Sequence, residues 1–207
     1  MRDFPRLIGN IDMIVTVYNF KGGVGKTSIS INLSLTLGWK IFSNDCYCPL
    51  AEVLPEDRFK IFEPGDEVTP YRGTDSIVYD FGGQIDFRIV PAVRQSDFVL
   101  IPVVADRIDI RVSLGTIQAV KEINGRIVVI ANKTQGNDFS SIRDAIRQCG
   151  EYPVFELKRS RAMQDMFRER KSIQSLVNEG GLRRYNYSAI NDQFQRIVEY
   201  MTGSRRP

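Results

Sequence analysis

The chain has 207 residues, of which 43% are hydrophobic, so it is long enough to bury one sizeable core. It contains no histidine, which excludes Ser-His and Cys-His catalysis, and its three cysteines are too few for a disulfide framework. The formal charge of +3 is a weak basic bias that identifies no partner by itself. No uncharged apolar run of about 18 residues and no secretory signal is found, so we expect a soluble, cytoplasmic protein.

Short apolar runs rich in β-branched residues predict strands along the chain. They cover residues 13–18, 40–43, 76–79, 98–104, 126–131 and 154–157, with a shorter strand at 59–62. Helix-like stretches follow several of them, at residues 107–123, 139–148, 161–170 and 189–201. Buried strands that alternate with helices form parallel sheets, so we predict an α/β fold in which a mostly parallel sheet has helices on both faces.

The domain organisation is predicted to be simple. Residues 1–12 precede the first strand and are expected to be an N-terminal extension, and residues 13–207 are expected to form one domain. Proline and glycine are frequent in residues 48–75, which predicts loops around the short strand at 59–62.

A glycine-rich loop follows the first predicted strand, with the sequence Lys21-Gly22-Gly23-Val24-Gly25-Lys26-Thr27. Glycines let backbone N–H groups curl around phosphates, Lys26 can reach the β- and γ-phosphate oxygens, and the Thr27 hydroxyl can ligate Mg²⁺. Ser28 is placed to touch the α-phosphate. The loop therefore predicts a P-loop NTPase that binds a nucleotide with magnesium.

The segment after this loop has a conflicting pattern. From Ile29 to Leu37, apolar and polar residues alternate as they do in a half-buried strand. A phosphate loop presents the N-terminal amides of a helix to its anion, so we predict a helix that begins near Lys26.

The loop departs from the generic pattern, because Phe20 stands where the first glycine is usual and Lys21 opens the loop. This deviant form resembles the loop of the ParA/MinD family of partition and positioning ATPases. The resemblance implies ATP and Mg²⁺ as cofactors. It also implies that Lys21 reaches across a sandwich dimer to the partner's nucleotide, so that the ATP-bound form is a homodimer.

The same resemblance extends over residues 13–201. Ile77-Val78-Tyr79-Asp80-Phe81-Gly82-Gly83 is similar to the family's second acidic strand and switch. This implies that Asp80 holds a magnesium-bound water and that Gly82 and Gly83 sense the γ-phosphate, whereas the alternative is an ordinary strand-end aspartate. Residues 126–132 resemble the strand that ends in an adenine-contacting asparagine, here Asn132, and residues 154–173 resemble sequence near the base pocket.

The first switch breaks the family pattern. The family reads Asp-x-Asp-Pro after its second strand, and alignment places Asp45 at the first aspartate and Tyr47 at the second. The second carboxylate positions or activates the attacking water in that family, and a phenol with a pKa near 10 is a poor base at neutral pH. A gap in the alignment, a substitute carboxylate such as Glu52 or Asp57, and a slow or inactive switch are the three interpretations. We predict a weak ATPase with Lys21, Lys26 and Asp45 as catalytic residues, and a non-hydrolysing ATP-binding scaffold as the alternative.

Family members that segregate DNA bind it through scattered basic side chains, which implies non-specific DNA and a ParB-like activator as partners and a plasmid-partition function. The candidate DNA-binding residues are Arg159, Arg161, Arg168, Lys171, Arg183 and Arg184, although such charges also serve simply for solvation. A positioning ATPase for a protein cargo or membrane is a further alternative. The last helix has an apolar face, for which core packing is favoured over membrane binding.

Overall fold

The computed structural model describes residues 12–83 and 87–203, which contain a seven-stranded sheet. The strands are β1 (Ile14–Tyr18), β2 (Lys40–Ser43), β3 (Phe59–Ile61), β4 (Ile77–Phe81), β5 (Phe98–Val103), β6 (Ile127–Thr134) and β7 (Val154–Lys158). Their order is β3-β2-β4-β1-β5-β6-β7, and every neighbouring pair is parallel. The predicted parallel α/β fold is therefore confirmed.

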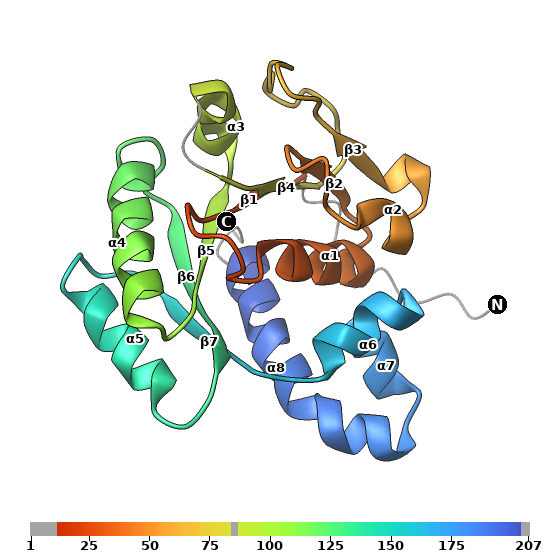
Figure 1. The fold of residues 1–207 in the computed structure, drawn as a ribbon. Coiled ribbons are helices and arrows are strands. Elements are labelled where there is room, and N and C mark those ends of the chain that lie inside the picture. The colour runs from red at the N-terminus through yellow and green to blue at the C-terminus, as the bar shows by residue number, and fades with distance from the viewer. Residues whose placement is uncertain (1–11, 84–86, 204–207) are drawn as a thin grey trace.

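Helices cover both faces of this sheet (Figure 1). One face carries α1 (Lys26–Leu37), α2 (Leu50–Val53), α6 (Ala162–Glu169), α7 (Ile173–Asn178) and α8 (Gly181–Gly203). The other carries α3 (Val90–Gln95), α4 (Arg107–Lys121) and α5 (Asp138–Arg147). Two short 3₁₀ helices, η1 (Glu56–Arg58) and η2 (Phe87–Ile89), complete the described elements.

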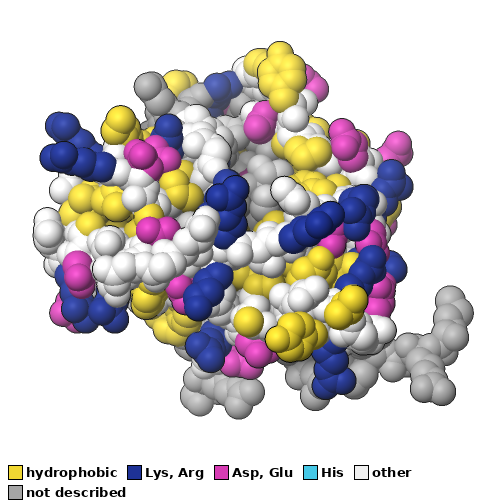
Figure 2. All heavy atoms as spheres, turned by 60° about the horizontal axis from the view of Figure 1, so that its bottom comes forward, with side chains coloured by type: hydrophobic (Ala, Val, Ile, Leu, Met, Phe, Trp, Pro, Cys, Tyr) yellow, Lys and Arg dark blue, Asp and Glu magenta, His cyan; other side chains and the backbone are white. Residues whose placement is uncertain are grey.

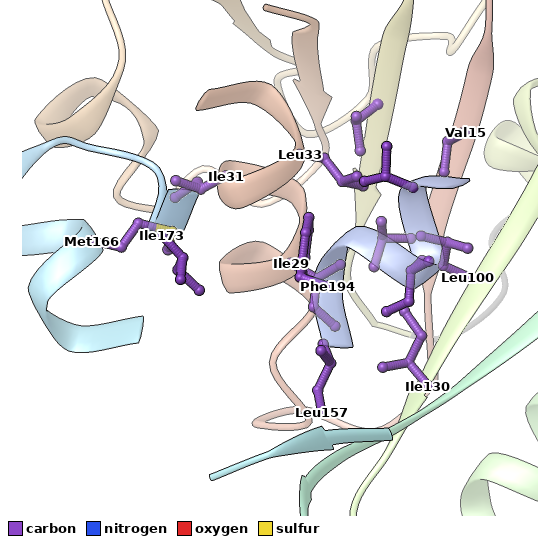
Figure 3. Close-up of a cluster of buried hydrophobic side chains, with 14 of the residues drawn as sticks. Val15, Ile29, Ile31, Leu33, Leu100, Ile130, Leu157, Met166, Ile173 and Phe194 are labelled. Carbon is purple, nitrogen blue, oxygen red and sulfur yellow. The ribbon is translucent and has the colours of Figure 1, made fainter. Parts of the chain in front are cut away.

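The core has two layers because successive strand residues point to opposite faces of a sheet. Val15 and Val17 of β1 pack in the layer that contains α1 and α8, whereas Tyr18 packs in the layer that contains α4 and α5. Figure 3 shows part of the first layer, where Phe194 of α8 lies among side chains of α1 and the central strands.

The conflict at residues 29–37 is resolved in favour of helix. Six consecutive residues of α1, Ile29 to Ser34, are buried, because one side of the helix faces the sheet and the other faces α7. Ile31 lies toward Met166 and Ile173, on the side away from the sheet (Figure 3). A helix that is buried around its circumference shows no helical period, which explains why its sequence alternates like a strand.

Some helices differ from the sequence prediction. The last helix begins at Gly181, eight residues earlier than predicted, and α2, α3 and α7 were not predicted. The apolar face of α8 packs in the core, as favoured above; its buried residues there are Ile190, Phe194, Ile197, Val198 and Met201. Among the described residues, no helix is both long and apolar enough to cross a membrane. Apart from Asp12, the predicted extension at residues 1–12 lies outside the described part of the chain.

Candidate nucleotide-binding site

The carboxyl ends of parallel strands meet at one edge of a sheet, and ligands of such folds bind there. At this edge lies a cavity of about 370 Å³. Its walls come from the loops after β1, β2 and β4, the first turn of α1, and the carboxyl ends of β4 and β6. The residues that line it are Gly22, Gly23, Gly25, Lys26, Thr27, Ser28, Asp45, Asp80, Gly82, Gly83 and Lys133. Ten of these eleven positions are predicted site residues, and Lys133 is the exception.

The glycine-rich loop leads directly into α1, whose first residue is Lys26. Gly25 has a φ of 94°, and a Cβ atom there would lie 2.3 Å from the side-chain nitrogen of Asn132, so glycine is required on both counts. Within the described residues, no protein acceptor pairs with the backbone N–H groups of residues 22–26. These N–H groups and the helix N-terminus form an arrangement suited to an anion.

Lys26 lies in the wall of this cavity, where its ammonium group donates a hydrogen bond to the Lys21 carbonyl oxygen at 2.9 Å. Burial lowers the pKa of Lys26, and the attraction of Asp80 and Asp45 acts in the opposite direction. An anion bound at the loop would favour the charged ammonium in the same way as these carboxylates do.

Asp80, at the end of β4, is only 2% exposed. One of its carboxylate oxygens accepts a hydrogen bond from the Ser30 hydroxyl at 3.1 Å, and Thr27 also donates to the carboxylate. Burial raises the pKa of Asp80 to about 6, although these hydrogen bonds and the Lys26 charge lower it. A cation bound beside Asp80 would stabilise the ionised form of this buried carboxylate.

The chemistry of this donor set fits Mg²⁺. Asp80 and Thr27 supply oxygen atoms, and magnesium sites commonly combine one or two carboxylates with phosphate oxygens of the ligand. Within residues 12–83 and 87–203, no group of three or more His, Cys, Asp or Glu side chains could hold a metal ion. A magnesium ion here would therefore need oxygen atoms from the nucleotide and water.

The first switch brings one carboxylate to the cavity. Asp45 lines it, whereas the Tyr47 side chain is 93% exposed and does not. The substitute carboxylates considered above, Glu52 and Asp57, are also exposed and outside the cavity wall. Asp45 and Asp80 are thus the carboxylates that line the cavity within the described part of the chain.

Lys21 is held by its own chain in this structure. Its ammonium group forms an ion pair with Asp109 of α4, with 3.1 Å between nitrogen and oxygen. The Lys21 side chain is 39% exposed and that of Asp109 is 16% exposed. The resemblance implies that Lys21 reaches a partner's nucleotide, and that movement requires this ion pair to break.

A second cavity, of about 430 Å³, adjoins the first, since Ser28 and Lys133 line both. Its other lining residues are Asn132, Lys158, Arg159, Ser160, Met163, Gln164 and Phe167. Asn132 donates a hydrogen bond from its amide to the Val24 carbonyl oxygen of the glycine-rich loop at 2.7 Å. Residues 154–173, which resemble base-pocket sequence, thus supply most of this wall, and adenine contact by Asn132 stays a prediction.

Three site residues were missed by the sequence analysis. Asn19 is buried and fixes the start of the loop, because its side chain accepts from the Lys21 N–H at 2.9 Å and donates to the Pro102 carbonyl at 2.7 Å. Asn44 and Gly82 form two reciprocal hydrogen bonds that join the first and second switches. Lys133 is the third. Asn19 and Asn44 come directly after β1 and β2, and Lys133 lies near the end of β6. A polar residue at the carboxyl end of an apolar strand was the sequence signal that could have identified them.

Carboxylates neutralise three of the six candidate DNA-binding residues. Arg168 pairs with Asp165 at 2.8 Å, Lys171 pairs with Glu179 at 2.5 Å, and Arg183 pairs with Glu169 and Glu179. Arg159 lines the second cavity. Arg161 and Arg184 are exposed and are in no recorded ion pair with a described residue. Figure 2 shows Lys and Arg side chains interspersed with Asp and Glu over the face that it presents.

No protein-family model matches the chain. Among curated proteins, it is 30% identical over 92 residues to the chloroplastic Fe-S cluster assembly factor HCF101 of Oryza sativa subsp. japonica. That match covers 40% of this chain and only 17% of the length of that relative.

Solved structures resemble the chain over nearly its whole length. An ATP complex of McdA from Cyanothece has a TM-score of 0.67 at 12% identity, and the match covers 96% of this chain and 99% of that one. MinD of Pyrococcus horikoshii OT3 with Mg-ADP has a TM-score of 0.65 at 12% identity, covering 92% and 99%. A putative plasmid partition protein from Borrelia burgdorferi B31 bound to AMPPNP has a TM-score of 0.60 at 15% identity, covering 92% and 100%. The chain has the fold of the ParA/MinD-type P-loop ATPases.

Proposed function

We propose that this chain, which has the ParA/MinD-type fold, is a switch protein that binds Mg-ATP and dimerises in its ATP-bound form. The observation that carries the proposal is the cavity at the carboxyl edge of the sheet. There Lys26, Thr27, Asp80 and the free N–H groups of the glycine-rich loop converge on one space. Each of these groups has a chemical reason to meet a magnesium-bound polyphosphate.

The second cavity supports a nucleotide rather than an isolated anion. It opens beside the phosphate loop and combines the apolar side chains of Met163 and Phe167 with the polar side chains of Asn132 and Gln164. Ligand sites of this kind bury flat rings between apolar groups and fix them with a few polar contacts. We assign it to the base and the first cavity to the phosphates.

Exposed apolar side chains at the same edge support dimerisation. Tyr47, Phe87 and Ile108 follow β2, β4 and β5 in the chain and are 93%, 83% and 69% exposed. Exposed large apolar side chains that follow these strand ends would be covered by a partner subunit in such a dimer. Lys21 opens the loop at this edge, where a partner subunit could receive it.

Hydrolysis in this proposal is slow. Asp45 is the carboxylate left to position water at the γ-phosphate, since Asp80 is engaged by Ser30 and Thr27. Loss of a water-positioning group lowers the rate of phosphoryl transfer by orders of magnitude and leaves binding intact. A non-hydrolysing ATP-dependent clamp is the second candidate, and the exposed Tyr47 side chain favours it.

We further propose that the protein acts in DNA partition, together with a ParB-like activator. Three of the six candidate cations are neutralised by carboxylates, so we expect the ATP dimer to bind DNA weakly through Arg161 and Arg184. Phosphate contacts of this kind make binding fall steeply with salt. ATP-dependent retardation of DNA that disappears at high salt supports this part, and retardation without ATP contradicts it.

The test of nucleotide binding is a titration with a fluorescent ATP analogue in the presence of Mg²⁺. Lys26→Ala should abolish binding, because Lys26 is the ammonium beside the predicted β- and γ-phosphate positions. Lys121→Ala, on the far part of α4, is a control that should bind normally. Tight ATP binding by Lys26→Ala would contradict the site.

A further inference from the structure

Lys133 has an unusual backbone conformation at the end of β6. Its φ of 58° lies in the left-handed region, which lysine adopts rarely and at a cost. The pairing of β6 with β7 shifts register at this residue, because Asn132 pairs with Leu157 and Thr134 pairs with Lys158. Lys133 is therefore the extra residue of a β-bulge, a feature that turns side chains in new directions beside functional sites.

The bulge brings two consecutive side chains to the same loop. In a regular strand Asn132 and Lys133 would point to opposite faces of the sheet. Here the Asn132 amide donates to the Val24 carbonyl oxygen at 2.7 Å, and the Lys133 ammonium donates to the Gly23 carbonyl oxygen at 2.8 Å. Two neighbouring carbonyl groups of the glycine-rich loop are thus held by one dipeptide.

These two hydrogen bonds determine how the loop presents its N–H groups. In a trans peptide the C=O and N–H groups of one plane point in opposite directions. Fixing the carbonyls of Gly23 and Val24 toward Asn132 and Lys133 therefore directs the N–H groups of Val24 and Gly25 away from them. Those N–H groups have no protein acceptor in the described residues, as an anion-binding loop requires.

We infer that Lys133 is a positioning residue that holds the glycine-rich loop in its anion-binding conformation before the nucleotide arrives. The inference rests on the proposed function, since it assigns the loop to the phosphates. Lys133 lines both cavities and its ammonium group is bonded to Gly23 of the loop, so we expect its effect on the phosphate end of the ligand. A hydrogen bond from a charged donor to a single carbonyl supports an effect of about tenfold on affinity.

The experiment compares Lys133→Met, Lys133→Arg and Lys133→Gly with the unchanged protein. Lys133→Met keeps most of the side-chain length and removes the donor, Lys133→Arg restores a donor, and Lys133→Gly removes the side chain while relieving the left-handed backbone. Backbone ¹⁵N order parameters of residues 22–25 in the ligand-free protein, measured by NMR relaxation, are the first measurement. Titrations with Mg-ADP and with adenosine are the second.

Lower order parameters over residues 22–25 are expected in Lys133→Met and Lys133→Gly, with rescue in Lys133→Arg. Affinity for Mg-ADP should fall about tenfold in the first two variants, and affinity for adenosine should be unchanged. Unchanged order parameters in Lys133→Met would overturn the inference, and so would an equal loss of Mg-ADP and adenosine affinity. If the unchanged protein binds no nucleotide, the proposed function fails, whereas the order-parameter comparison still decides the role of Lys133.

Discussion

At the scale of single residues, the site is organised around charges that burial has made costly. Asp80 is buried beside Lys26, and neither group reaches the solvation that an exposed ion would have. Burial lowers the pKa of Lys26 and raises that of Asp80, and in both cases the neutral form gains. Without a ligand, the charged forms of both side chains are therefore poorly stabilised. An anion near Lys26 and a cation near Asp80 would stabilise them.

Replacing Asp80 tests this cost. The rise from 3.8 to about 6 means that the folded state keeps a proton which the unfolded chain loses between pH 4 and pH 6. The contribution of Asp80 to the free energy of unfolding therefore falls as pH rises through this window, by about 3 kcal/mol in total. Asp80→Asn cannot ionise, so without nucleotide it should be more stable than the unchanged protein above pH 6, and the two should converge below pH 4.

Urea unfolding at several pH values between 4 and 8 measures this difference, with Mg²⁺ and nucleotide absent. The other carboxylates titrate in both proteins, so their contributions to the pH dependence cancel in the stability difference. A stability difference that does not change with pH would show that Asp80 ionises normally in the folded state.

Tyr47 is the residue at which hydrolysis is expected to be limited. Tyr47→Asp places a carboxylate where the resemblance assigns the water-positioning group, and it should raise steady-state turnover of Mg-ATP by tenfold or more. Tyr47→Phe is the matched control, because it removes the hydroxyl and adds no base. Equal turnover by Tyr47→Asp and Tyr47→Phe would show that position 47 does not reach the γ-phosphate.

The sequence was most informative about residues that act through their chemical type. The convergence of Lys26, Thr27 and Asp80 on one cavity could be predicted, because a phosphate loop and a strand-end carboxylate are recognised by residue type. Lys133 could not, since its role depends on a β-bulge that turns its side chain, and no local pattern marks that bulge. The ion pair of Arg183 with Glu169, fourteen residues away, was equally hidden. The pairs Arg168–Asp165 and Arg183–Glu179 have helical spacing and could have been predicted from the sequence.

At the scale of secondary structure, the junction between the glycine-rich loop and α1 is the decisive element. Its geometry combines a left-handed glycine with a close approach of Asn132 from β6. Context from the loop predicted this helix correctly although the residue pattern favoured a strand. The start of α8 was missed for the opposite reason, because Leu182 and Tyr185 are exposed and obscure the helical period.

Gly25→Ala tests this junction. Gly25 has a φ of 94° and its added Cβ atom would lie 2.3 Å from the Asn132 side chain, so we expect a loss of stability of about 2–3 kcal/mol and loss of ATP binding. Gly38→Ala at the end of α1 is the control, since Gly38 has a φ of 79° but nothing lies within 4 Å of the added atom. It should lose about 1 kcal/mol and bind ATP normally. If Gly25→Ala and Gly38→Ala lose equal stability in thermal or urea unfolding, the Asn132 side chain must move aside without an energetic cost.

At the scale of the whole molecule, the arrangement favours a protein whose association depends on nucleotide. The cavity lies at the carboxyl edge of the sheet, and the exposed residues Tyr47, Phe87 and Ile108 follow β2, β4 and β5 in the chain. Lys21 sits at this edge in an ion pair with Asp109, which keeps it within its own subunit. The Lys21 end of this pair is 39% exposed, and ion pairs at protein surfaces typically contribute about 1 kcal/mol or less, so we expect a nucleotide bound in a partner subunit to displace it.

Light scattering of the purified protein with Mg-ATP, Mg-ADP and no nucleotide tests the central claim most directly. The unchanged protein should dimerise with Mg-ATP and stay monomeric otherwise. Lys21→Ala should bind ATP but fail to dimerise, and Asp109→Asn, which releases Lys21, should dimerise a fewfold more tightly. A protein that stays monomeric while saturated with Mg-ATP, or a Lys21→Ala variant that dimerises normally, would contradict the account.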